Sequence, residues 1–99
     1  GANLFTARAA GDELIGEHDE VNSGQEELYL LLRGSALFVL DGERHEVEAV
    51  SVVAVSDVSV RRAAVALEAG ATVLAVGAAP GAYRSTWRSA WFDRVPKLR

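Results

Sequence analysis

The sequence predicts an all-β fold, and three observations lead to this prediction. Apolar and polar residues alternate with a period of two through most of the chain, which is the pattern of half-buried strands. The dipeptide Asp41-Gly42 stands between two such runs and favours the type I′ turn of a β-hairpin, because that turn needs positive φ at both central positions. Short runs of this kind follow one another at regular spacing, as in a sandwich or barrel.

Seven or eight strands are expected, and turn-forming residues mark their ends. The weakest candidates are residues 4–9 and 13–17, near the start of the chain. Gly70 and the pair Pro80-Gly81 separate or terminate later runs that are rich in Val and Ala. The stronger candidates are, in order, residues 26–33, 35–40, 43–48, 51–55, 58–67 and 71–77.

Length and composition indicate one globular domain, spanning residues 1–99. The chain is 49% hydrophobic and 24% charged, which excludes a disordered or collagen-like protein. It holds no apolar run long enough for a transmembrane helix, and no signal peptide is recognisable, so we expect a cytoplasmic protein that binds no membrane. Because cysteine is absent, disulfides, thiolate nucleophiles and Cys-ligated zinc are excluded.

The charges are segregated along the chain. The formal net charge is −4, but residues 1–48 hold eleven acidic residues and three arginines, whereas residues 49–99 hold seven basic and three acidic residues. Such segregation is typical of self-association or of a polar site between the two halves. A nucleic-acid-binding protein usually has a net basic charge, so we expect no nucleic-acid partner.

Several expected strands are apolar on both faces. In residues 35–40, Phe38 and Leu40 share one face, while Leu37 and Val39 share the other. One face can line the interior, and the other must be covered by a second sheet, by the chain's own termini or by a partner subunit. We therefore expect a homodimer or a larger oligomer.

The C-terminal tail, residues 83–99, has a different pattern. Tyr83, Trp87 and Trp91 recur at intervals of four, which predicts a short helix or strap packed on the barrel wall. A lid over the cavity mouth is an alternative. Basic residues lie between these aromatic residues, but the acidic remainder of the chain disfavours binding of single-stranded nucleic acid.

Glu27 is followed by six residues, Gly34, an apolar strand and the Asp41-Gly42 turn. This arrangement resembles the first signature of the cupin superfamily, and the resemblance covers about residues 12–80. It implies a cupin-type double-stranded β-helix, a jelly-roll-like barrel, to which the aromatic spacing of the tail adds a short C-terminal helix or strap. It implies little about activity, because one fold supports many functions.

Metal-dependent members of that superfamily hold a divalent ion with a His-x-His pair, the Glu and a further His. Here Glu27 is retained, but the paired positions fall on Glu20 and Asn22, or on Val21 and Ser23, and the last falls on or near Arg61. A guanidinium stays protonated and cannot coordinate a cation. We therefore expect neither a metal nor another cofactor, with Arg61 pointing inward and paired with Glu27.

His18 is the one residue that could restore a metal site. It shares strand parity with Glu20, so a shifted site of His18, Glu20 and Glu27 is an alternative. The competing interpretation is an ordinary histidine at a strand edge or in a loop.

Three functions remain open, and the first is preferred. It is a metal-free barrel that binds a small molecule, possibly an anion held by Arg61. The residues expected to contact this ligand are Glu20, Asn22, Glu27, Tyr29, Phe38 and Arg61, with Leu40 on the same inner surface.

The second is a metal-independent isomerase, cyclase or lyase, with Glu27 as base and Tyr29 or His18 as acid. Pairing with an arginine lowers the pKa of a glutamate and weakens it as a base, so catalysis ranks lower. The third is a structural or interaction module whose barrel is filled by side chains.

Overall fold

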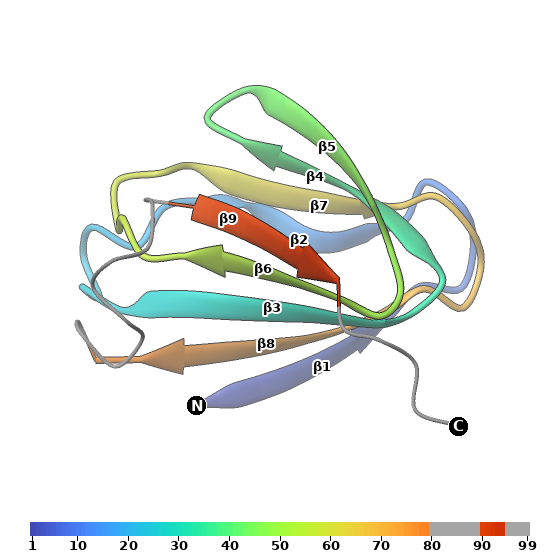
Figure 1. The fold of residues 1–99 in the computed structure, drawn as a ribbon, viewed down its shortest axis with the longest axis horizontal. Coiled ribbons are helices and arrows are strands. Elements are labelled where there is room, and N and C mark those ends of the chain that lie inside the picture. The colour runs from blue at the N-terminus through green and yellow to red at the C-terminus, as the bar shows by residue number, and fades with distance from the viewer. Residues whose placement is uncertain (80–89, 95–99) are drawn as a thin grey trace.

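Two antiparallel β-sheets pack against each other in the computed structural model of the chain, which describes residues 1–79 and 90–94 (Figure 1). The first sheet has the strand order β1-β8-β3-β6-β9, and the second has the order β2-β7-β4-β5. The strands are β1 (Ala2–Thr6), β2 (Glu13–His18), β3 (Glu26–Arg33), β4 (Ser35–Leu40), β5 (Glu43–Glu48), β6 (Ser51–Val55), β7 (Arg62–Ala66), β8 (Thr72–Ala78) and β9 (Ala90–Arg94). The predicted all-β class is confirmed.

The pairing of the first eight strands is nested. Strand β1 pairs with β8, β2 with β7, β3 with β6 and β4 with β5, so strands that lie far apart in the sequence become neighbours. The hairpin between β4 and β5 is the innermost of these pairs, and Asp41 and Gly42 at its turn have φ values of 49° and 81°. The predicted turn with positive φ at both residues is confirmed.

Gly34 carries the chain from the first sheet to the second. It is the single residue between β3 and β4, and its φ is 76°. A Cβ at this position would come within 3.0 Å of the Cα of Ala71. Only glycine fits both the left-handed conformation and this close approach of two backbones.

The core lies between the inner faces of the two sheets. Alternation along β3 and β4 places one side of each strand inside, so Tyr29, Leu31 and Phe38 are all at most 1% exposed. The remaining core residues come mainly from the other strands and include Ile15, Val53, Val55, Ala64, Ala66 and Val73.

Strand β7 is shorter than predicted. The sequence favours a strand over residues 58–67, but β7 begins at Arg62. The side chain of Asp57 accepts hydrogen bonds from the backbone N–H of Ser59 at 2.9 Å and from its hydroxyl at 2.7 Å. This local turn competes with strand pairing and delays the start of β7.

The C-terminal tail is a strand where it is described. Residues 90–94 form β9 on the edge of β6, with Trp91 opposite Ala54 in the register, so a helix through Trp91 is wrong. Pairing with β6 satisfies the backbone groups of both segments, and the spacing of aromatic residues does not outweigh this gain. Tyr83, Trp87 and residues 95–99 lie outside the described residues. Within residues 1–79 and 90–94, no helix has the length and apolar character needed to cross a membrane.

Candidate functional site

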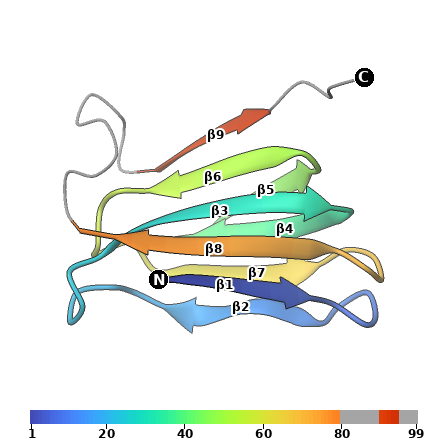
Figure 2. The same ribbon diagram turned by 90° about the horizontal axis from the view of Figure 1, so that it is seen from below.

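The edge strands β1 and β2 flank a pocket with a volume of about 230 Å³. Figure 2 shows both strands along the same side of the molecule. We call this cavity the seam pocket, because it lies where the edges of the two sheets meet. Its wall is formed by Asn3, Phe5, Leu14, Ile15, Gly16, His18, Glu27, Tyr29 and Ala75.

Glu27 is the polar centre of the seam pocket. It lies on the inner face of β3, two residues before Tyr29, and its side chain is 14% exposed. Its Oε1 atom accepts a hydrogen bond from the Tyr29 hydroxyl and another from NH1 of Arg62 at 3.0 Å. The same oxygen lies 3.3 Å from Nε2 of His18. Three side chains therefore converge on one carboxylate oxygen.

Arg62 links the two sheets through this carboxylate. Its side chain is only 1% exposed, and it crosses from β7 to Glu27 on β3. Its Nε and NH2 atoms donate to the carbonyl of Val60 at 3.0 and 2.9 Å, and NH2 also donates to the carbonyl of Asp57 at 3.3 Å. Each guanidinium nitrogen thus already has a protein partner, so Arg62 is poorly placed to bind a ligand anion.

Arg61 does not point inward, so its predicted orientation is wrong. Its side chain is 53% exposed, with NH2 3.7 Å from Glu17 and NH1 3.5 Å from Asp19. The backbone N–H of Arg61 donates to the Asp41 side chain at 2.7 Å, just before β7 begins. Strand parity therefore gives the inward position to the next residue, Arg62. The predicted pairing of Glu27 with an arginine is present, one residue further along the chain.

His18 and Glu20 stand beside Glu27. The Nε2 atom of His18 lies 3.3 Å from an oxygen of Glu20 and 3.3 Å from Oε1 of Glu27, while Nδ1 lies 2.7 Å from the carbonyl of Gly16. His18 is also opposite Arg62 in the register of β2 and β7. The sequence alternative that grouped His18, Glu20 and Glu27 thus describes a real cluster.

Within the part of the chain that the structure describes, these three residues form the group that could hold a metal ion. One ligand atom from each of His18, Glu20 and Glu27 lies within 4.8 Å of the other two. However, the guanidinium of Arg62 is 3.0 Å from Oε1 of Glu27. A fixed positive charge at that distance opposes direct coordination of a divalent metal ion by this carboxylate.

Two other predicted site residues do not reach the pocket. Asn22 is exposed in the turn between β2 and β3, and Phe38 is 1% exposed in the core, with its ring centroid 5.8 Å from that of Tyr29. Leu40 is also buried, at 6% exposure. Of the residues expected to contact a ligand, Glu27 and Tyr29 line the seam pocket and Glu20 lies next to it.

Sequence reasoning missed Arg62 and the apolar pocket wall. The run from Arg61 to Ala66 offers two arginines and then small residues, so its polarity does not reveal which arginine faces inward. The available signal was Asp57 with Ser59 two residues later, a turn pattern that marks where the strand can begin. The same hydrogen bonds from Ser59 hold the pKa of the Asp57 carboxyl below its usual value.

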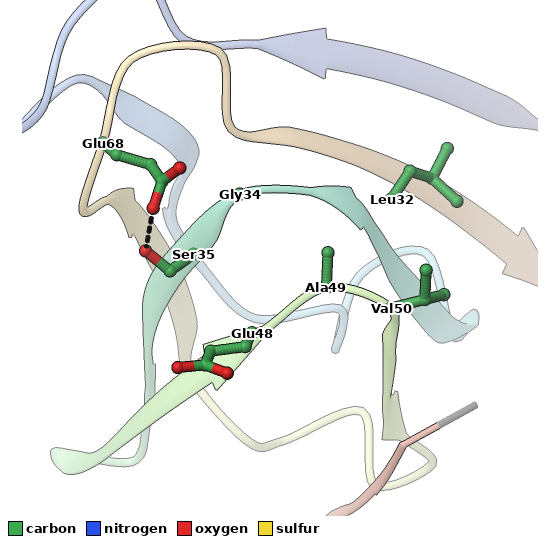
Figure 3. A pocket seen from close by; sticks show the side chains of 7 residues that line it. All are labelled: Leu32, Gly34, Ser35, Glu48, Ala49, Val50 and Glu68. Atoms are coloured by element: carbon green, nitrogen blue, oxygen red, sulfur yellow. Dashed lines mark hydrogen bonds between the residues drawn. The ribbon is translucent and has the colours of Figure 1, made fainter. Parts of the chain in front are cut away.

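A second cleft, with a volume of about 360 Å³, lies around Gly34, where β3 ends and β4 begins (Figure 3). The hydroxyl of Ser35 donates to Glu68 at 2.8 Å on one side, and Leu32 and Val50 form the other side. None of the residues predicted to form a site lines this cleft. The seam pocket is therefore the better candidate.

The Tyr29 hydroxyl gives the site a measurable pH dependence. Burial, followed by the hydrogen bond to Glu27, raises the pKa of Tyr29 well above its usual value of 10.0. At a pH above 10.0 the unfolded chain releases the Tyr29 proton, whereas the folded chain keeps it. The free energy of unfolding should therefore fall as pH rises. The expected slope is up to about 1.4 kcal/mol per pH unit.

Urea unfolding between about pH 9 and pH 11 measures this slope. The variant Tyr29→Phe lacks the titrating group and should show a shallower dependence than the unsubstituted chain. Equal slopes in the two proteins would show that Tyr29 titrates alike in the folded and unfolded states.

No protein-family model and no curated protein sequence matches the chain.

Proposed function

We propose that this chain binds a small molecule in the seam pocket, with an apolar body against the strands and a singly charged cationic or hydrogen-bond-donating group toward Glu20, beside the Glu27–Arg62 pair. One observation carries the proposal: a cavity of about 230 Å³ has apolar walls and ends on His18, Glu27 and Tyr29. Mostly apolar walls with a few convergent polar groups are typical of ligand sites. The volume is below the roughly 300–1,000 Å³ of drug-sized sites, so the ligand is small.

The charges at the pocket favour a cationic ligand over an anionic one. Glu20 and Glu27 bring two carboxylates to the same end, with side chains 18% and 14% exposed. Arg62 balances one of them, but its nitrogens are already bound within the protein. The sequence-based expectation of an anion depended on Arg61, which lies outside the pocket. A primary amine with a small apolar group fits this arrangement best.

Benzylamine is a suitable probe, and benzoate is its matched anionic counterpart. In an NMR titration, benzylamine should shift the signals of seam-pocket residues with a Kd of about 1 mM, and benzoate should bind at least about tenfold more weakly.

Variants of strand β8 test the location of the ligand. Ala75→Leu fills the pocket and should abolish the shifts, whereas Val76→Leu on the same strand leaves the pocket wall unchanged. Glu20→Gln should weaken benzylamine binding without unfolding the chain. Binding of benzoate as tight as that of benzylamine would contradict the proposed ligand class.

Acid–base catalysis remains a second candidate because of His18. Its Nε2 atom lies 3.3 Å from both Glu20 and Glu27, a distance that permits proton exchange with small movement. However, Oε1 of Glu27 already accepts hydrogen bonds from Arg62 and Tyr29, so this oxygen is less available to accept a proton from a substrate. The filled-barrel alternative draws support from the tightly packed centre of the sandwich, but it leaves the seam pocket without a role.

We also propose that the two sheets form a cupin-type jelly-roll barrel. The nested pairing of β1 with β8, β2 with β7, β3 with β6 and β4 with β5 supports this assignment. The position of Glu27 on an inner strand face, followed by the turn at Gly34, agrees with the resemblance seen in the sequence.

A further inference from the structure

We propose that strand β1 pairs edge to edge with β1 of a second copy of this chain, antiparallel about a two-fold axis. Among residues 1–79 and 90–94, strand β1 is one edge of the five-stranded sheet, and β8 is its neighbour on one side only. All five residues from Ala2 to Thr6 are exposed. This proposal is independent of the proposed ligand.

Backbone hydrogen bonds at both ends of β1 show which groups its open edge presents. The N–H of Gly77 donates to the carbonyl of Gly1 at 2.9 Å, and the N–H of Ala7 donates to the carbonyl of Ala71 at 2.9 Å. Hydrogen-bonded and non-bonded pairs alternate along an antiparallel ladder. Every second residue between these ends therefore directs its N–H and C=O away from β8. These residues are Ala2, Leu4 and Thr6.

The other described edges carry features that discourage pairing with another chain, and β1 does not. Strand β5 has the sequence Glu-Arg-His-Glu-Val-Glu, which places charges along its edge. Strand β2 has two register shifts within its pairing to β7, and the sequence of β9 contains Asp93 and Arg94. Charges and bulges are common protections of sheet edges. Strand β1, Ala-Asn-Leu-Phe-Thr, has no charge, no proline and no register shift.

A second copy is the occupant that suits this edge. Strand β1 has no charged side chain that would attract an acidic or basic partner strand. For the same reason, two copies of β1 can pair without charge repulsion. A two-fold axis at Leu4 places it opposite Leu4 of the partner subunit and places Ala2 opposite Thr6 of the partner subunit. The outward backbone groups then meet as hydrogen-bonded pairs on both sides of the axis.

The side chain of Leu4 adds a second reason for self-pairing. Leu4 is 62% exposed and begins an apolar row on the outer face, with Leu74 and then Leu30 next to it in the register. Pairing would set Leu4 against Leu4 of the partner subunit, so the rows of the two copies would become continuous. The sequence also predicts a partner subunit from strands that are apolar on both faces.

Sedimentation equilibrium of the full chain, from micromolar to millimolar concentration, tests the proposal. The mass should rise from one to two copies of the 10.5 kDa chain. Leu4→Pro removes an outward N–H and leaves the bonds to β8 intact, so it should raise the dimer Kd about thirtyfold or more, since both bonds at the axis are lost. Leu4→Thr keeps the N–H and should change the Kd by less than about tenfold.

Amide hydrogen exchange of the unsubstituted chain gives a readout that does not depend on the variants folding. The amides of Leu4 and Thr6 should be protected at dimer concentrations and exchange rapidly on dilution, whereas those of Asn3 and Phe5 should be protected in both cases. A single-chain mass at every concentration would overturn the proposal. So would a dimer in which the amides of Leu4 and Thr6 still exchange rapidly, because its interface would lie elsewhere.

Discussion

Replacing Arg62 by methionine is expected to lower the free energy of unfolding by about 3–5 kcal/mol. The guanidinium is 1% exposed and pairs at 3.0 Å with Glu27, which is itself 14% exposed. Methionine fills a similar volume, but it leaves the largely buried Glu27 carboxylate without its positively charged partner. It also leaves the carbonyl of Val60 without its two donors from Arg62. The loss of a partner, rather than the loss of volume, accounts for the effect.

The neighbouring arginine is the matched control. Arg61→Met changes the same residue type one position away, but its side chain is 53% exposed and its ion pairs are 3.5 Å and 3.7 Å long. Such surface pairs contribute at most about 1 kcal/mol, so this variant should unfold at nearly the same urea concentration as the unsubstituted chain. Equal losses from the two substitutions would mean that Arg62 is no more buried than Arg61 in solution.

A double-mutant cycle separates the pair from its surroundings. Glu27→Gln alone leaves Arg62 buried beside a neutral amide and should also destabilise the fold. In the double variant neither charge remains, so its loss should be smaller than the two single losses added together, by about 0.5–3 kcal/mol. Strict additivity would show that Arg62 stabilises the fold through Val60 and Asp57 alone.

The difference between Arg61 and Arg62 shows where sequence reasoning reaches its limit. The strands β3, β4, β5 and β6 have the predicted boundaries because alternation, Gly34 and the Asp41-Gly42 turn act locally and agree with one another. The inward position of Glu27 follows from the same alternation. The face of β7 does not, because it depends on the turn at Asp57 and on the bonds between Asp41 and Arg61.

The tail and the pocket required information that no local pattern contains. Residues 90–94 become a strand because β6 offers them an edge, which is a contact between distant parts of the chain. The wall of the seam pocket combines residues from β1, β2, β3 and β8. Strand β1, Ala2–Thr6, only partly overlaps the weak sequence candidate at residues 4–9. Phe38 was placed correctly on an inner face, but its depth in the core depends on how closely the two sheets pack.

Substitutions of Phe38 and of Phe5 should therefore have different effects on the free energy of unfolding and on ligand binding. Phe38 is 1% exposed against Tyr29 and does not line the seam pocket, whereas Phe5 is 41% exposed and does. Phe38→Ala should lower the free energy of unfolding by about 3–5 kcal/mol, because it removes a ring from a closed core. Phe5→Ala should cost much less, since its ring already contacts water.

Benzylamine binding should respond in the opposite order. Phe5→Ala removes part of the pocket wall and should raise the benzylamine Kd several-fold. Phe38→Leu, which keeps most of the buried volume and should cost less than about 1.5 kcal/mol, should leave that Kd unchanged. Urea unfolding and NMR titration of the three variants measure both effects. If Phe38→Leu weakened benzylamine binding as much as Phe5→Ala, the ligand would lie deeper between the sheets, as the sequence alone suggested, and the seam pocket would not be its site.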